Sequence, residues 1–172
     1  IFQRTGHRWV QGAKLRAEDG KSGDKFGVGA SIDGTTAIIA AEVGTVYIFH
    51  HTTGGWKQQV KFVAEDVNAE GKLGPSVAVS GDYAIVEHSD QGTVLIFRRT
   101  QDRWILHQRL TTLEDNAMDR FFGGNVSISG DYAIVSAKYD DDYGSDSGAA
   151  YIFKLSGGHW VQQTKLTPND AG

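Results

Sequence analysis

Residues 122–135 read FGGNVSISGDYAIV, and this stretch decides the fold because the chain contains it three times. The aligned copies are FGVGASIDGTTAII at 26–39 and LGPSVAVSGDYAIV at 73–86. Each copy places a glycine-centred turn between two segments rich in small and β-branched residues. That pattern indicates a β-hairpin, because glycine tolerates the positive φ of a tight turn. Each copy therefore predicts two antiparallel strands, here called A and B.

Two further strands are predicted after each hairpin. An aromatic and β-branched stretch comes first, as GTVYIF (44–49), GTVLIF (92–97) and GAAYIF (148–153), and predicts strand C. A tryptophan follows the phenylalanine of that stretch at a fixed distance, and from it the residues alternate, as in Trp56–Phe62. Alternation indicates a strand with one face in solvent, so this stretch predicts an outer strand D. The four tryptophans at this position are Trp9, Trp56, Trp104 and Trp160.

The repeat predicts the fold class. Four-stranded units with a period close to 50 residues are typical of β-propellers. A β-solenoid is the alternative, but its coils are shorter and do not need four hairpin-linked strands. We therefore expect an all-β chain, a β-propeller segment of about three four-stranded blades plus an orphan C–D hairpin.

The domain organisation follows from the same register. We expect one β-propeller repeat array over residues 1–172, with repeats at approximately 21–66, 67–115 and 116–170, and a partial preceding repeat at 1–20.

The hairpin sequence and the following SGAAYIF resemble the FG-GAP repeat family, the blades of integrin-α-like propellers. The likeness is greatest to the bacterial-type variant in which strands A and B are joined by Ser-Gly-Asp. It extends over essentially the whole chain. It implies an extracellular or cell-surface protein but no particular activity, because the family occurs in adhesion receptors, lectin-like proteins and many other extracellular proteins. Two departures are Leu73, where the other copies have phenylalanine, and Asp33-Gly34-Thr35 in place of Ser-Gly-Asp.

The resemblance does not transfer a calcium site to the A–B connection. Integrin-type blades bind calcium there through an acidic loop, whereas here the connection is a tight turn. Such a turn is too short to surround an ion with six or seven oxygen ligands.

The sequence YDDDYGSDSG (139–148) interrupts the repeat. The first two copies cross the same B–C connection with AEVG and HSDQG, so the third has an insertion of about eight residues, by alignment of the repeat. The spacing of Asp140, Asp142 and Asp146 is loosely compatible with a weak calcium site, the one metal or cofactor that the sequence suggests. A solvated acidic loop, which we favour, and a partner contact are the other interpretations.

Composition excludes several function classes. The chain has 172 residues, a net charge of −4 and no cysteine, so it offers no thiolate nucleophile or disulfide framework. Its basic residues are scattered and outnumbered by acids, which argues against nucleic-acid binding. No apolar run is long enough for a membrane span. We find no Ser-His-Asp spacing and no phosphate-binding loop, so no catalytic residues are predicted and the chain is not expected to be an enzyme.

The recurrence of tryptophan at one repeat position favours packing between blades over an array of sugar-binding platforms. The six histidines show no metal-binding spacing and are interpreted as surface residues.

The register at the two ends leads to an expectation about partners. Ile1-Phe2 matches the middle of strand C, so the chain contains three full blades, which cannot close a ring of four to eight. Uncovered blade faces would expose apolar surface. We expect them to be covered by self-association into a ring or filament, or by the remainder of a longer chain.

The predicted function is a non-enzymatic extracellular scaffold or interaction protein. The alternative is a carbohydrate- or protein-binding module, assisted by calcium at the aspartate loop. A propeller enzyme is the third and least favoured hypothesis.

Overall fold

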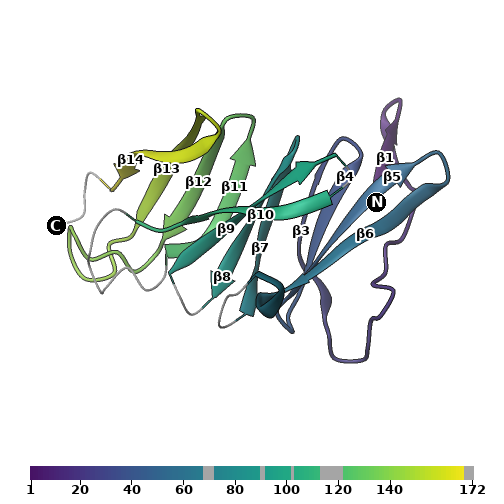
Figure 1. Ribbon diagram of the computed structural model, residues 1–172, viewed down its shortest axis with the longest axis horizontal. Helices are drawn as coiled ribbons and strands as arrows, with labels where there is room; N and C mark the ends of the chain where they lie inside the picture. The colour runs from purple at the N-terminus through teal and green to yellow at the C-terminus, as the bar shows by residue number, and fades with distance from the viewer. Residues whose placement is uncertain (68–71, 90–91, 102, 113–121, 169–172) are drawn as a thin grey trace.

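The computed structural model of the chain describes residues 1–67, 72–89, 92–101, 103–112 and 122–168. These residues form three four-stranded antiparallel sheets and one two-stranded hairpin. Figure 1 shows the sheets standing side by side, in chain order from the purple N-terminal end to the yellow C-terminal end. The predicted all-β fold with propeller blades is confirmed.

The strands follow the repeat closely. The N-terminal hairpin consists of β1 (Phe2–Thr5) and β2 (Arg8–Gln11). The first blade contains β3 (Phe26–Asp33), β4 (Thr36–Ala41), β5 (Thr45–Thr52) and β6 (Gly55–Val63), followed by the 3-10 turn η1 (Ala64–Val67). The second blade contains β7 (Lys72–Ser80), β8 (Tyr83–Ser89), β9 (Thr93–Thr100) and β10 (Arg103–Leu110). The third blade contains β11 (Phe122–Ser129), β12 (Tyr132–Ala137), β13 (Ala149–Ser156) and β14 (His159–Leu166).

Each blade pairs its strands in sequence order, from A to D, through consecutive hairpins. The A–B turns contain Gly34, Gly81 and Gly130 with φ of 53°, 56° and 54°. A side chain at these positions would be strained, which explains why each copy has glycine at the centre of the turn.

Burial decreases toward the outer strand, as the alternation predicts. In the first blade every residue of β4 is buried, and so are the first five residues of β5. Strand β6 is only half-buried and alternates along its length. In the first blade the inner strands β4 and β5 are therefore covered on both faces, and β6 faces solvent on one side.

Each blade has two apolar faces, an N-side face toward the preceding part of the chain and a C-side face toward the following part. The C-side face of the first blade packs on the N-side face of the second, and Ile38 shares one core cluster with Val79, Val86 and Trp104. The second and third blades repeat this arrangement, and Ile85 lies in their shared cluster.

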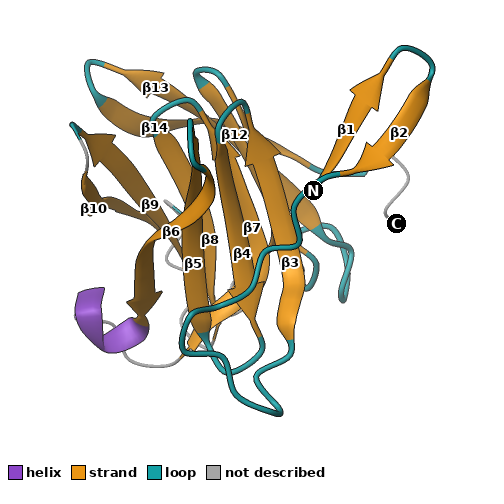
Figure 2. Ribbon diagram, turned by 90° about the vertical axis from the view of Figure 1, so that its right-hand side faces the viewer, coloured by secondary structure: helices purple, strands orange, loops and turns teal. Residues whose placement is uncertain are grey.

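The N-terminal hairpin stands away from the three blades (Figure 2). The segment that follows it runs across the N-side face of the first blade, where Leu15 and Ala17 pack on Tyr47 and Phe49. Among the residues described above, no helix is long and apolar enough to cross a membrane.

Candidate functional sites at the blade interfaces and the aspartate loop

The blades are joined at their A–B turns by equivalent hydrogen bonds. The Gly81 N–H donates to Asp33 Oδ2 of the first blade at 2.7 Å. The Gly130 N–H donates to Ser80 Oγ of the second blade at 3.1 Å. Asp33 and Ser80 occupy the same repeat position, so both interfaces contain the same hydrogen bond between neighbouring A–B turns.

The outer strands join the blades through a β-bulge. The C–D register shifts at the same place in all three blades, which leaves Gln59, His107 and Gln163 as the extra residues. A bulge re-aims a side chain relative to the regular ladder. Gln59 Oε1 accepts a hydrogen bond from Trp104 Nε1 at 3.0 Å, and His107 Nε2 lies 2.9 Å from the Gly158 carbonyl oxygen. The bulge residue thus reaches the next blade at both interfaces.

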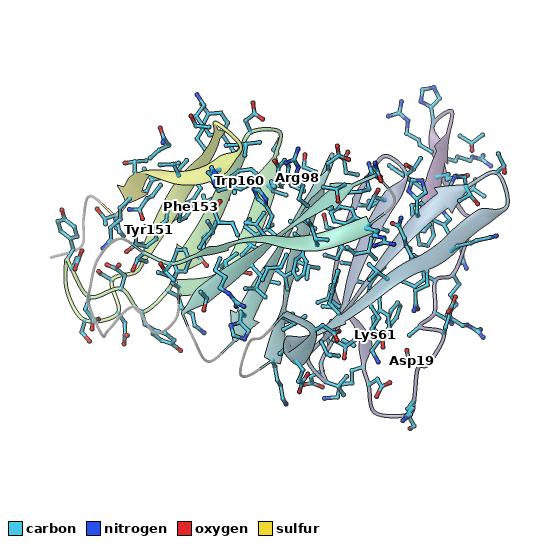
Figure 3. The ribbon with its side chains drawn as sticks, viewed as in Figure 1. Asp19, Lys61, Arg98, Tyr151, Phe153 and Trp160 are labelled. Carbon is cyan, nitrogen blue, oxygen red and sulfur yellow. The ribbon has the colours of Figure 1, made fainter. Side chains whose placement is uncertain are left out.

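Two of the four repeated tryptophans are packing residues between blades. Trp104 and Trp160 are buried, and Trp160 lies edge-on to Tyr83 of the second blade with the ring centroids 5.5 Å apart. Figure 3 shows Trp160 at the junction of these two blades. Trp56 is half-buried, and Trp9 on the N-terminal hairpin is 68% exposed. The packing interpretation therefore describes the internal interfaces, where a sugar could not reach the rings.

The aspartate loop is organised around one buried carboxylate. Asp140 is 1% exposed and accepts a hydrogen bond from the Tyr151 hydroxyl at 3.0 Å. The Lys165 ammonium lies 2.7 Å from the same carboxylate and also pairs with Asp142. Because a buried charge is costly unless it is paired and hydrogen-bonded, these contacts explain why a carboxylate can be placed here.

The structure does not gather the three predicted metal ligands around one point. Asp142 is exposed on one side of the Lys165 ammonium, and Asp146 is exposed with φ of 55° and donates its N–H to Asp141 Oδ1 at 2.6 Å. Within the described ranges no three His, Asp or Glu side chains are placed to hold a metal ion together. The loop is closed instead by bonds to the Asp140 carbonyl oxygen from the Gly148 N–H and the Ser147 hydroxyl.

A matching cluster lies at the other end of the array. Tyr47 and Lys61 occupy the repeat positions of Tyr151 and Lys165, and both bind Asp19, at 3.2 and 2.5 Å. Figure 3 shows Asp19 and Lys61 together, far from Tyr151. The Lys61 hydrogen bond lowers the pKa of the Asp19 carboxyl, and the same bond raises the pKa of the Lys61 ammonium. Burial and then the Asp19 bond raise the pKa of the Tyr47 hydroxyl.

Sequence reasoning missed a polar pair at the end of β8. Glu87 Oε2 accepts the Ser76 N–H at 3.2 Å, and burial raises the pKa of the Glu87 carboxyl. His88 is 3% exposed, and neither of its ring nitrogens has a hydrogen-bond partner within the described part of the chain. The interpretation of the histidines as surface residues is wrong for His88. The aligned copies have the small residues Ala40-Ala41 and Ser136-Ala137 at these positions. This difference within the repeat could have indicated that Glu87 is half-buried and His88 is buried.

Comparison with known proteins supports the repeat directly. The model of the FG-GAP repeat matches residues 9–49, 56–92 and 104–153. No curated protein sequence matches the chain.

Two solved structures from Saccharomyces cerevisiae are similar to the chain. Sqt1, a propeller-type structure, has a TM-score of 0.57 at 8% identity and is matched over 83% of this chain and 36% of its own. A complex of Dbp5 bound to Nup159, Gle1, IP6 and ADP has a TM-score of 0.46 at 17% identity, over 78% of this chain and 35% of that one. The chain thus spans about a third of the length of both. At 8% identity, the likeness to Sqt1 concerns the fold alone.

Proposed function

Because the chain belongs to the FG-GAP repeat family, we propose that it is a non-enzymatic scaffold and interaction protein of the extracellular space or cell surface. In this proposal its blades pack against further blades and build a closed ring or a fibre. The Ser-Gly-Asp connections of the second and third blades support our assignment of the chain to the bacterial-type variant of the family.

The repetition of one interface carries this proposal. Both internal interfaces use a turn residue that accepts the N–H of the next turn glycine. Both also use a bulge residue that contacts strand D of the next blade or the turn before it. Every blade therefore has both halves of a head-to-tail contact. Such heterologous contacts generate rings when the rotation closes and filaments when it does not.

Uncovered apolar side chains on the outer blades support the same proposal. On the third blade Ile134 and Leu166 are exposed, although Ile85 and Leu110 at the same positions of the second blade are buried. Exposed apolar patches of this kind mark interaction surfaces.

The mass of the particle in solution tests the proposal. Light scattering after size-exclusion chromatography, over a range of concentrations, should give multiples of the 18.7 kDa chain mass. Negative-stain electron microscopy should then show rings or fibres. A mass of one chain at every concentration would contradict assembly by this chain.

A second candidate function is recognition of a carbohydrate or protein ligand by the third blade. The observation that favours it is the exposure of Tyr139 and Tyr143 beside exposed Asp141 and Asp142, in the loop that breaks the repeat. Aromatic rings beside acceptor oxygens match the mixed apolar and polar surface of a sugar. Tyr143→Ala should abolish binding on a glycan array. Unchanged binding by this variant would exclude the loop as the carbohydrate-binding site.

The predicted calcium assistance belongs to this second candidate. Calcium prefers carboxylate oxygens, and Asp142 and Asp146 are exposed whereas Asp140 is buried, so calcium would compete with Lys165 for the Asp142 carboxylate. Calcium titration by calorimetry should give a heat of binding that Asp142→Asn with Asp146→Asn removes. The absence of heat in the unmodified chain would refute calcium assistance.

A further inference from the structure

An apolar groove lies between the N-terminal hairpin and the N-side face of the first blade. Its volume is about 500 Å³. From the hairpin side it is lined by Ile1 and Leu15, and from the blade by Phe26, Ile32, Ala37 and Ile39.

The same place is filled at both internal interfaces. Val79 and Val86 of the second blade occupy the positions of Ile32 and Ile39, and they share a core cluster with Ile38 from strand B of the first blade. In the third blade the equivalent side chains share a cluster with Ile85, again from strand B of the preceding blade. Ile38 and Ile85 are both completely buried. A strand-B isoleucine is therefore among the side chains that cover these positions, together with strand-C residues such as Ile48 and Ile96.

The N-terminal segment leaves strand A of the first blade's N-side face open, because Ile32 is 52% exposed whereas Ile39 of strand B is 6% exposed. Leu15 has the repeat position of Phe62 and Leu110, which end strand D, and it packs on the first blade as they pack on the next one. The N-terminal hairpin corresponds to strands C and D, so it provides no side chains equivalent to those of strands A and B of a preceding blade. The groove thus lies where the inner strands of a preceding blade would pack.

Strands A and B of the third blade, β11 and β12, have an exposed C-side face. On its C-side face Ile134 of β12, at the position of Ile38 and Ile85, is 39% exposed. Ser129 ends β11 at the position of Asp33 and Ser80, the two residues that accept the next turn glycine. Gly34 in the first blade is the turn glycine that would meet it.

We propose that the groove receives β11 and β12 of a second copy of this chain, with Ile134 inserted against Ile32 and Ile39, and with Ser129 accepting the Gly34 N–H. The contact repeats the inner-strand part of the two internal interfaces, and it rests on the proposed assembly function. It is confined to the inner strands, because Leu15 and Ala17 occupy the outer part of the face.

Two charge substitutions test the two sides of this contact separately. Ile32→Asp changes the groove and Ile134→Asp changes the inserted side chain, and both residues are exposed in the single chain, so folding should survive. Ile105→Asp on β10 is the matched control, because this isoleucine has a similar exposure but lies on the second blade, outside both surfaces of the proposed contact. Circular dichroism and thermal melting establish that each variant is folded.

Sedimentation velocity then measures whether each folded variant forms multimers. The unmodified chain and Ile105→Asp should form multimers, and each of the other two variants alone should sediment as single chains. A mixture of Ile32→Asp and Ile134→Asp should form a heterodimer that does not grow, because only one intact groove and one intact β12 remain per pair. If Ile32→Asp does not fold, Ala30→Arg at another exposed groove residue replaces it.

The remaining outcomes separate this inference from the proposed function. Multimers that both variants leave intact would overturn the groove contact but keep assembly by another surface. Single chains at every concentration of the unmodified protein would overturn both.

Discussion

The first and third blades place the same two side chains around an aspartate that comes from different parts of the chain. In the first blade Tyr47 and Lys61 bind Asp19, which precedes strand A. In the third blade Tyr151 and Lys165 bind Asp140, which follows strand B. The second blade has Leu95 at the tyrosine position, and its Asp66 accepts the Val63 N–H instead. In both blades the tyrosine hydroxyl therefore donates to an aspartate, and the loop that lies next to the tyrosine provides that aspartate.

The two clusters differ in burial. Asp140 is almost completely buried, whereas the Asp19 side chain is 48% exposed. An ion pair at the surface is screened by water, and a buried one leaves an uncompensated charge when one partner is removed. The same contacts should therefore contribute very differently to the free energy of unfolding. This difference can be measured with matched substitutions.

The largest effect is expected from Lys165→Met. This change leaves Asp140 buried beside Asp142 without its cation, and breaking a buried pair in this way costs about 3–5 kcal/mol of unfolding free energy. Lys61→Met is the matched change in the first blade, and we expect a far smaller loss because Asp19 can turn to solvent. Urea denaturation of both variants measures the comparison.

Equal losses in the two lysine variants would contradict the burial argument. Asp140→Asn in the Lys165→Met background is the control, because it removes the unpaired charge and should recover part of the lost stability. No recovery would mean that Lys165 acts through packing on the Tyr151 ring, 5.4 Å away, rather than through its charge.

A smaller effect is expected from Tyr151→Phe. The Asp140 carboxylate then loses a hydrogen-bond donor in a buried place, which costs about 1–3 kcal/mol. Tyr47→Phe should cost less, since water can replace the hydroxyl at half-exposed Asp19. Thermal unfolding by calorimetry is a sufficient measurement, and a larger loss in Tyr47→Phe would reverse the comparison.

The sequence predicted the repeat-based part of the molecule and missed what the repeat does not contain. The A–B turns and the burial order followed from glycine positions and alternation, because these are local signals. Tyr47 and Tyr151 were visible as equivalent residues, but Asp19 and Asp140 do not align. Their roles depend on loops that fold back over strands, which is a tertiary event. The three interpretations of 139–148, as a calcium loop, a solvated loop or a partner contact, did not include a buried carboxylate such as that of Asp140.

The bulges and the groove also could not be predicted from the sequence. Gln59, His107 and Gln163 share a position, yet their side chains differ in chemistry, and nothing in the alternation indicates an extra residue. The groove depends on how far the N-terminal segment covers the first blade, and only the packing of Leu15 shows this.

The smallest effect is the pH dependence of the Asp19 cluster. The pKa of the Asp19 carboxyl is lowered in the folded chain from its ordinary value of 3.8. The carboxylate therefore stabilises the fold fully above that value, and the contribution is lost as pH falls through the lowered folded pKa. Asp19→Asn should be slightly less stable than the unmodified chain near neutral pH, and the difference should vanish well below pH 3.8.

Carbon-13 NMR titration of the Asp19 carboxyl measures this shift directly. Because the hydrogen bond from Lys61 is its largest cause, Lys61→Met should return the titration toward the ordinary value, whereas Lys165→Met should leave it unchanged. A midpoint at 3.8 in the unmodified chain would show that the Lys61 pair is open in solution. In that case only the buried cluster of the third blade would hold its aspartate as an ion pair.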